Sequence, residues 1–406
     1  MLTVEEARAR VLASIGSIDA EEISIADALG RVLAEHVVAP ADIPAADNTA
    51  MDGYAVRAAS TAGATNEQPA VLDVIETLPA GYVASEIVGE GQATRIMTGA
   101  AIPEGADAVV IVEVTETDGD RVRVFREVRQ GANIRRRGED VATGQVLFEP
   151  GAAVGAGEIG LLASIRKSQV RVARRPIVAI VSTGDELVEV DAEPAPGQIV
   201  NSNAYTLAAL ARDAGCEPRV LPIARDTLED ITGALRAASY ADVVLTSGGV
   251  SVGEFDYVKA ALEELGATLD FWRVAMKPGK PVVFAKLGAK PFFGLPGNPV
   301  SCMVAFHLFV WPALQKLVGR PEDRWMRPVV AAVLANDVRS TGDRRNYLRG
   351  VVTARGGGLE VATKRAQGSG VLSSMTDANG LVVVPEGVTA IAAGSRVEVQ
   401  LIGEVH

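Results

Sequence analysis

The stretch ADVVLTSGGVSVGEFDYV, residues 241–258, joins an apolar strand to a helix through a glycine-rich loop. Two glycines directly after the apolar run leave bare backbone at the edge of a sheet, where N–H groups followed by a helix N-terminus attract anions. Asp256 in the same loop would repel a phosphate unless a cation lies between them. The stretch therefore predicts an anionic ligand held with a metal ion. The alternative is a tight strand-to-helix turn with a capped helix.

The segments around this loop predict the domain organisation. From 176 to 325, apolar strands alternate with amphipathic helices at a spacing typical of a doubly wound, mostly parallel α/β sheet. Short β runs separated by turn signals predict an inserted β domain over 47–140. Residues 1–46 and 141–175 contribute helices and linkers to an N-terminal domain. Short β runs return over 326–406, where we expect a C-terminal domain resembling a β-barrel, so the fold class is multidomain α/β.

Composition excludes several classes of protein. The chain has 406 residues and a net charge of −12, which argues against a nucleic-acid binder, because such a protein needs a basic surface. Its two cysteines exclude a disulfide framework and a cysteine zinc site. The first residues lack the apolar core of a signal peptide, and no apolar run approaches the ~18 residues that span a bilayer. We therefore expect a cytoplasmic protein with no membrane partner.

Acidic and amide residues follow the predicted parallel strands. STGDEL carries Asp185 and Glu186, ARD ends at Asp226, the loop quoted first carries Asp256, and GLPGNPVS carries Asn298. Ligands of open doubly wound sheets bind beyond the carboxyl ends of the strands, so these side chains should lie along one edge. Any one of the loops alone is easily a plain turn. Together they predict a binding site at that edge.

Basic residues supply the opposite charge. KPGKP holds Lys277 and Lys280 close together, and their repulsion favours an anion between them. With the carboxylates they suit a nucleotide phosphate and Mg²⁺, which prefers hard oxygen ligands from Asp and phosphate. Gly-Ser turns among basic residues of the C-terminal region suit a second anion pocket; these residues are Arg344, Arg345, Arg349, Lys364, Arg365 and Ser369. The alternative is solvated turns.

The inserted β domain carries charges that its folding does not require. Asp52 precedes Gly53 in NTAMDGYAVR, RIMTGA ends a strand at Thr98, and NIRRRGEDV places three arginines before Asp140. A run of arginines is more often a solvated face than a binding site. This region becomes informative only in combination with the other motifs.

Taken in order, these motifs resemble the molybdopterin molybdenumtransferase family, MoeA and the gephyrin E-domain. The matching stretches run from about residue 47 to 303 and are NTAMDGYAVR, IMTGAAIPEGADAVV, RRRGEDV, VSTGDELV, NSNAY, TSGGVSVGEFDYV, KPGKP and LPGNPVS. TSGGVSVGEFD is shared with related molybdopterin-binding proteins. The pairing of AMDGYA with LPGNPVS is more specific, and the C-terminal region is the least distinctive.

The resemblance implies a transferase of molybdenum cofactor biosynthesis. Its substrates would be adenylylated molybdopterin and molybdate, its products the molybdenum cofactor and AMP, and its cofactor Mg²⁺. It also implies a homodimer with the site in a cleft between subunits, and the adenylyltransferase of the same pathway is a candidate partner. Two alternatives stay open: the chain is itself a molybdopterin adenylyltransferase, or it is a gephyrin-like dimeric scaffold.

The resemblance also implies roles for individual residues. Asp226, Asp256 and Glu186 would hold Mg²⁺ or position a water. The catalytic residues would be Asp52, Thr98, Asp140, Glu186, Lys277 and Lys280, of which Asp52, Thr98 and Asp140 would come from the second protomer. The substrate-binding residues would be Ser247, Gly248, Gly249, Ser251, Gly253, Pro296, Asn298, Pro299, Arg345, Arg349, Lys364 and Ser373. The last four are candidates for binding the pterin phosphate or molybdate.

Overall fold

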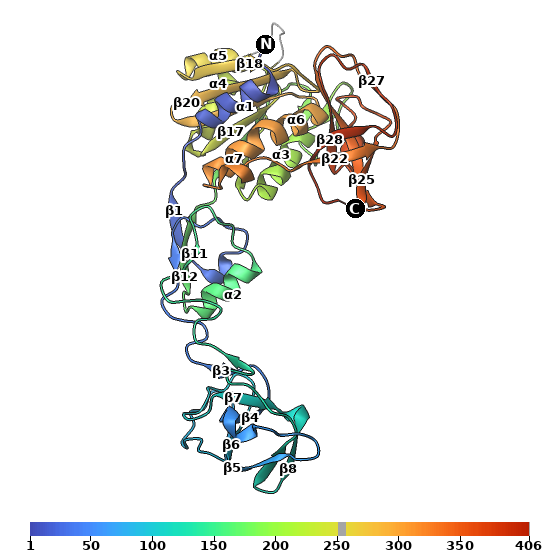
Figure 1. Cartoon of the computed structure of the whole chain (residues 1–406). Coiled ribbons are helices and arrows are strands. Elements are labelled where there is room, and N and C mark those ends of the chain that lie inside the picture. The colour runs from blue at the N-terminus through green and yellow to red at the C-terminus, as the bar shows by residue number, and fades with distance from the viewer. Residues whose placement is uncertain (251–256, 406) are drawn as a thin grey trace. The chain divides into compact units, whose positions relative to one another are not determined.

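The chain divides into two compact units, and each is described by itself. The computed structural model describes residues 1–250 and 257–405. Unit 1 comprises residues 1–35, 150–160 and 168–406, and unit 2 comprises residues 36–149 and 161–167. Figure 1 shows the whole chain, coloured by residue number. The four domain boundaries expected from the sequence stay a prediction.

The centre of unit 1 is a mixed sheet with the strand order β16-β13-β17-β21-β20-β18. Its strands are β13 (Ile177–Ser182), β16 (Glu217–Val220), β17 (Val243–Ser247), β18 (Thr268–Arg273), β20 (Pro281–Leu287) and β21 (Lys290–Leu295). The first four in this order pair in parallel, whereas β20 and β18 are antiparallel to their neighbours. The predicted mostly parallel sheet is confirmed. Parallel pairing brings the carboxyl ends of these strands to one edge.

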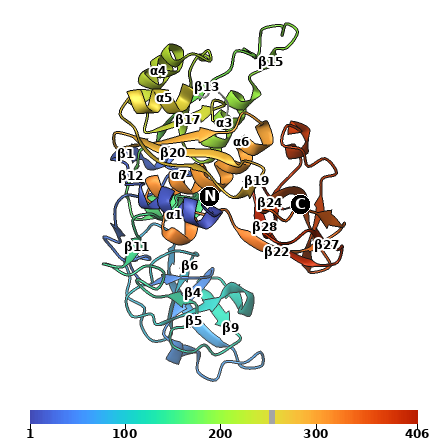
Figure 2. The ribbon, with the colours of Figure 1, turned by 90° about the horizontal axis from the view of Figure 1, so that it is seen from above.

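Helices cover both faces of this sheet, and Figure 2 shows α4 and α5 on one side and α1 and α7 on the other. The helices are α1 (Val4–Ala13), α3 (Ser202–Asp213), α4 (Leu228–Ala237), α5 (Tyr257–Glu264), α6 (Pro299–Ala305) and α7 (Trp311–Leu317). The side chains of successive strand residues point to opposite faces of the sheet and pack in two different cores. Leu245 packs with α1, α3, α6 and α7, whereas Val244 packs with α4 and α5. This alternation follows from the two-residue period of a strand buried on both faces.

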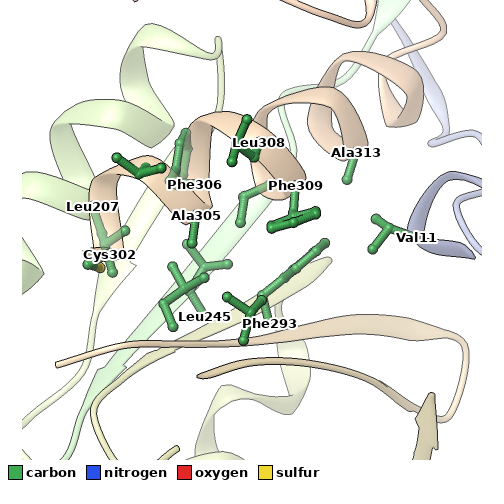
Figure 3. Close-up of a cluster of buried hydrophobic side chains, with 14 of the residues drawn as sticks. Val11, Leu207, Leu245, Phe293, Cys302, Ala305, Phe306, Leu308, Phe309 and Ala313 are labelled. Atoms are coloured by element: carbon green, nitrogen blue, oxygen red, sulfur yellow. The ribbon is translucent and has the colours of Figure 1, made fainter. Parts of the chain in front are cut away.

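The helix from residue 299 to 317 forms the middle of the larger core. Figure 3 shows Ala305, Phe309 and Ala313 on this helix facing the strands that carry Leu245 and Phe293. The helix is α-helical at both ends and π-helical over Phe306–Val310. Pro312 lacks the N–H that an α-helix would donate to the carbonyl four residues earlier, and a π turn just before it accommodates the missing bond. The sequence predicts a kink at Pro312; the structure has the π turn.

The same helix corrects the expectation that no apolar run is long enough to span a bilayer. Pro299–Leu317 has 19 residues and a window of mean hydropathy 1.3. Within unit 1, however, 83% of that window is buried. Length and composition alone do not separate a membrane span from the central helix of a core, and here the burial identifies a core helix.

The C-terminal part of unit 1 is a closed β-barrel. Its strands are β22 (Val329–Leu334), β24 (Arg345–Arg355), β25 (Gly358–Thr363), β26 (Gly380–Val384) and β28 (Arg396–Leu401). The order β24-β25-β22-β28-β26 closes on itself because β26 also pairs with β24. Gly350 and Gly380 face each other across that closing pair, and a Cβ on Gly380 would lie 2.6 Å from Val399. The predicted barrel-like domain is confirmed.

Short pairs complete unit 1. A ribbon of β1 (Ala20–Ser24) and β12 (Gln169–Ala173) is antiparallel, and β14 (Leu187–Val188) pairs with β15 (Ile199–Val200). β23 (Val338–Arg339) pairs with β27 (Ala390–Ile391), and β19 (Met276–Lys277) lies parallel to the start of β24. The pairing of β19 with β24 connects the KPGKP segment to the barrel.

Unit 2 contains a β sheet of order β7-β4-β6-β5-β9-β8. Its strands are β4 (Gly53–Val56), β5 (Ala70–Leu78), β6 (Gln92–Ile96), β7 (Ala108–Ile111), β8 (Thr115–Asp118) and β9 (Arg121–Val124). Two small pairs accompany it, β3 (Asn48–Thr49) with β10 (Ile134–Arg135) and β2 (Val37–Val38) with β11 (Val146–Phe148). Helix α2 (Ala156–Ser164) includes residues of both units.

We expect Phe309→Ala to destabilise unit 1 by about 3–5 kcal/mol, because the ring is fully buried and its removal leaves a cavity between the central helix and the sheet. Thermal unfolding of the purified variant measures this loss. The matched control is Tyr240→Ala, since Tyr240 is 54% exposed and should change stability by less than about 0.5 kcal/mol. Equal losses in the two variants would contradict the assignment of the core.

Candidate active site

A cavity of about 650 Å³ lies at the carboxyl ends of the parallel strands of unit 1. We call it the strand-end cavity. The predicted site residues that line it are Glu186, Asp226, Ser247, Gly248, Gly249, Pro296, Asn298 and Pro299. They come from the loops after β13, β16, β17 and β21, which parallel pairing places side by side. Ser251, Gly253 and Asp256, also predicted here, lie outside the described residues.

The glycines after β17 allow the backbone to form the floor of this cavity. Gly248 has φ +93° and Gly249 φ +64°, a region that L-residues with side chains rarely adopt. A Cβ on Gly248 would lie 2.6 Å from the carbonyl oxygen of Thr183. Asn203 ties this loop to the next one, because its Nδ2 donates to Ser247 Oγ and to the Gly297 carbonyl, each at 2.7 Å. The loop geometry thus requires glycine at 248.

Two buried oxygen atoms in the wall of the strand-end cavity have no hydrogen-bond partner within the described part of the chain. They are Thr183 Oγ1 and Asn203 Oδ1. A buried polar atom without a partner is costly, so a ligand or water that supplies a donor would stabilise this wall.

The charge of the strand-end cavity is negative. Among its described lining residues, Glu186 and Asp226 are the charged ones, and no Lys or Arg lines it. Burial raises the pKa of Asp226, and the nearby carboxylates of Asp185 and Glu186 raise it further. Each of these causes disfavours the ionised form of Asp226, and a cation beside it would favour that form.

The donor set fits a magnesium ion that is shared with a ligand. Within residues 1–250 and 257–405, no group of three or more His, Cys, Asp or Glu side chains could hold a metal by itself. Mg²⁺ commonly uses only one or two carboxylates and completes its octahedron with water and substrate phosphate oxygens. Asp226 and Glu186 satisfy that requirement. Their negative charges would repel a phosphate that arrives without a cation, so they favour a phosphate that is bound together with Mg²⁺.

A second cavity, of about 680 Å³, lies between the KPGKP turn and the barrel of unit 1. We call it the cationic cavity, because Lys277, Lys280, Arg339, Arg344 and Arg349 line it and no Asp or Glu does among its described lining residues. It adjoins the strand-end cavity, since both are lined by Pro281, Pro296 and Asn298. Two cavities of opposite charge thus share an uncharged wall.

Arg349 is the most unusual group of the cationic cavity, because its side chain is 0% exposed. Among the described residues it donates to neutral acceptors, from Nε to Ser374 Oγ at 3.1 Å and from Nη2 to the Gly368 carbonyl at 3.0 Å. Its Nη1 is buried and has no partner in that part of the chain. Burial lowers the pKa of Arg349 to about 10. A buried cation in this state favours an anion in the adjoining space.

Comparison with family models covers most of the chain. Residues 2–165 match the MoeA N-terminal region (domain I and II). Residues 179–316 match a probable molybdopterin binding domain, and residues 331–402 match the MoeA C-terminal region (domain IV). The chain belongs to the MoeA family.

Relatives and solved structures agree with this membership over nearly the full length. A molybdopterin molybdenumtransferase of Nostoc sp. is 40% identical over 93% of this chain and 88% of its own. One of Bacillus subtilis is 38% identical over 99% and 94%. The crystal structure of the molybdopterin biosynthesis moeA protein from Pyrococcus horikoshii OT3 superposes with a TM-score of 0.86 at 34% identity, over 99% of this chain and all of that one.

Three of the predicted substrate-binding residues of this MoeA chain that lie in unit 1 are outside both cavities, whereas Ser369 lines the cationic cavity as the sequence predicts. Arg345 pairs with Glu5 and lies 3.7 Å from Glu386, and Lys364 pairs with Asp377 at 2.8 Å. Neither residue lines a cavity, nor does Ser373. The structure therefore brings Arg349 together with the lysines but leaves these three apart, and their binding roles stay predictions.

Sequence reasoning missed Arg339, Ser301 and Gln367, which also line the cationic cavity. Ser301 is the last residue of the quoted LPGNPVS motif, so its place in that motif was an available signal. Arg339 lies on β23, outside every motif, and Gln367 follows the basic pair Lys364 and Arg365. Only the closure of the barrel against the KPGKP turn brings these two residues to the cavity.

In unit 2, the MoeA motif residues Asp52 and Thr98 contact each other directly. The Thr98 backbone N–H and hydroxyl both donate to the same Asp52 oxygen at 2.7 Å, and these bonds lower the pKa of Asp52. Asp140 is exposed, and its backbone N–H donates to the Ile43 carbonyl at 3.1 Å. Asp52 is therefore held ionised and oriented, while its catalytic role, like those of Thr98 and Asp140, stays a prediction.

The arginine run of unit 2 has acidic partners within the unit. Arg136 donates to Asp47 at 2.6 Å and Arg137 to Asp42 at 2.5 Å. Hydrogen bonds from Thr143 and then Arg137 lower the pKa of Asp42 to about 2. These pairs are exposed, so they contribute little to stability. They explain the arginines as partners of local acids.

We expect Asp226→Asn to stabilise the protein in metal-free buffer while removing a response to Mg²⁺. Because the folded-state pKa of Asp226 is raised, its ionised form destabilises the fold at neutral pH. That destabilisation shrinks as the pH falls below the folded-state pKa and is gone below the unfolded-state pKa. The variant should melt at a higher temperature than the wild type in EDTA and show a smaller upward shift with Mg²⁺.

The control for this measurement is Glu193→Gln, at an exposed carboxylate that does not line the cavity. Glu193→Gln should leave both melting temperatures unchanged. A wild-type Mg²⁺ shift that survives intact in Asp226→Asn would exclude Asp226 as a ligand.

Proposed function

We propose that this molybdopterin molybdenumtransferase takes adenylylated molybdopterin into the strand-end cavity and molybdate into the cationic cavity, and releases AMP with the help of Mg²⁺. The observation that carries the proposal is the pair of adjoining cavities with opposite lining charge. One has carboxylates and suits a phosphate that arrives with a divalent cation. The other has five cationic side chains and suits a bare dianion.

The strand-end cavity offers the elements that a phosphoanhydride needs. Gly248 and Gly249 have positive φ angles and no side chains, so a ligand can approach their main chain closely. Asp226 and Glu186 would hold Mg²⁺ together with phosphate oxygens, and the metal would withdraw charge from the phosphoryl group. Glu186 is exposed at the rim and is suited to orient a water toward the phosphorus. Attack by that water would form one P–O bond and break the P–O bond to the departing phosphate, and the proton of the water would pass to the Glu186 carboxylate and from there to solvent.

The cationic cavity offers directed donors for a tetrahedral oxyanion. Lys277 and Lys280 line one side, and Arg349 lies on the barrel side with an unpartnered Nη1. When two dithiolene thiols bind molybdenum, two Mo–S bonds form and one molybdate oxygen leaves as water with the two thiol protons. The shared wall of Pro281, Pro296 and Asn298 allows the two substrates to lie within reach of each other. The proposal assigns the two lysines to molybdate, whereas their sequence pattern favoured a nucleotide phosphate.

The proposal includes further features that the family resemblance implies. They are a homodimer in which Asp52, Thr98 and Asp140 take part in catalysis, the adenylyltransferase of the same pathway as a partner, and a cytoplasmic location. Light scattering of the purified chain tests the dimer. The matches to MoeA N-terminal and C-terminal regions favour the molybdenumtransferase over the adenylyltransferase alternative.

The decisive experiment supplies adenylylated molybdopterin, molybdate and Mg²⁺ and measures AMP and the molybdenum cofactor. We expect both products together, and we expect EDTA to suppress AMP release until excess Mg²⁺ restores it. Full AMP release in EDTA would contradict the magnesium role. Formation of adenylylated molybdopterin from ATP and molybdopterin would instead identify an adenylyltransferase.

We expect Lys277→Ala to raise the KM for molybdate about 10- to 100-fold, because a lost hydrogen bond to a charged group is worth about 1.5–3 kcal/mol. The KM for adenylylated molybdopterin should change less. Arg355→Ala is the matched control, since Arg355 lies on β24 but outside the cavity and pairs with Glu360 on the surface. If Lys277→Ala raises the KM only for the pterin substrate, the cationic cavity is not the molybdate site.

A further inference from the structure

The N-terminal segment of the chain contacts the two segments that carry the walls of the cationic cavity, at residues just outside the cavity. One contact is made by Leu2 and the other by Glu5, at the start of α1. The segment between them is fixed in place, because the side chains of Thr3 and Glu6 each accept a hydrogen bond from the other's backbone N–H, at 3.1 and 2.9 Å. Leu2 and Glu5 therefore hold a defined spacing from each other.

Leu2 contacts the wall that carries the lysines. We call residues 274–280 the lysine turn; it contains Lys277 and Lys280 and is closed by a hydrogen bond from Val274 N–H to the Lys280 carbonyl at 3.1 Å. Leu2 forms a parallel bridge with Val274, and its carbonyl accepts from Ala275 N–H at 2.8 Å. The base of the turn is thus bound to the residue that precedes the cap of α1.

Glu5 contacts the barrel strand that carries the opposite wall. Its carboxylate pairs with Arg345, the first residue of β24. Asn346 and Arg349, on the same strand, line the cationic cavity. The backbone of β24 also pairs with the lysine turn, with Arg345 opposite Met276 and Asn346 opposite Lys277. The lysine turn, the start of β24 and the N-terminal segment therefore form one closed set of contacts.

We propose that Leu2 and Glu5 act as a bracket that, together with the backbone pairing of β19 and β24, holds the lysine turn in position against β24, so that Glu5 is a positioning residue for the molybdate site. The inference rests on the proposed function, in which molybdate binds between these two walls. Glu5 does not touch the cavity and acts through Arg345. Without Glu5, Arg345 keeps a second acid, Glu386 at 3.7 Å, which draws the guanidinium away from α1.

The direction in which the KM for molybdate changes when Glu5 is neutralised distinguishes the bracket from a purely electrostatic effect. Glu5 is a negative charge near an anion site, so its neutralisation should tighten molybdate binding if charge alone mattered. The bracket gives the opposite result, because a wall displaced by about an ångström misplaces the donors. We expect Glu5→Gln to raise the KM for molybdate about tenfold, with kcat and the KM for adenylylated molybdopterin nearly unchanged.

Asp270→Asn is the matched control. Arg10 on the same helix pairs with Asp270 of β18 at 3.1 Å, and neither residue lines the cationic cavity. This variant removes one acid from one ion pair of α1, as Glu5→Gln does, and should leave every kinetic constant unchanged. Glu5→Asp keeps the charge with a shorter reach and should restore part of the lost molybdate affinity. It also keeps the test valid if Glu5→Gln folds poorly.

The outcomes separate the bracket from the proposed function. A raised molybdate KM in Glu5→Gln, with partial recovery in Glu5→Asp, supports the bracket. An unchanged or lower KM in Glu5→Gln, while Lys277→Ala raises it, overturns the bracket and leaves the molybdate site standing. If Lys277→Ala does not weaken molybdate either, the site itself is misplaced and the bracket fails with it.

Discussion

Parallel pairing of β13, β17 and β21 is the constraint on which the rest of unit 1 depends. Pairing of this kind requires each strand to start from the same side, so the loops that leave the strands all emerge at one edge. Helices on both faces bury the apolar side chains of the sheet. Polar residues therefore lie at its edge, in the loops that follow the strands. Thr183, Gly248 and Pro296 become neighbours for this reason, although they are far apart in the sequence.

The barrel adds what the sheet edge lacks. Loops at the end of the sheet contribute acids and backbone, whereas the arginines of the cationic cavity come from residues 339–349. The barrel reaches the sheet through β19, whose two residues pair with the start of β24. A chain with a net charge of −12 thereby concentrates five cations in one cavity. Local concentration is necessary, because the protein as a whole repels anions.

The sequence predicted the parts that local patterns determine. Strand and helix alternation gave the mostly parallel sheet, and the Gly-Gly after ADVVL marked the loop at the strand-end cavity. The C-terminal assignments depended on distant contacts instead. Arg345 pairs with Glu5, 340 residues away, and the environment of Arg349 depends on Ser374 and Gly368. Two arginines four residues apart on one strand thus differ in role for reasons that no local pattern contains.

In the function proposed above, charge separation between the two cavities would allow two anions to be held side by side. Two unit charges about 8 Å apart repel each other by roughly 2 kcal/mol at an effective dielectric constant of about 20, and a dianion doubles that figure. A divalent cation between Asp226 and a phosphate would offset one side, and the buried Arg349 with the lysine pair the other. The dividing wall then needs no charge of its own. It is built from Pro281, Pro296 and Asn298, which line both cavities and carry no net charge.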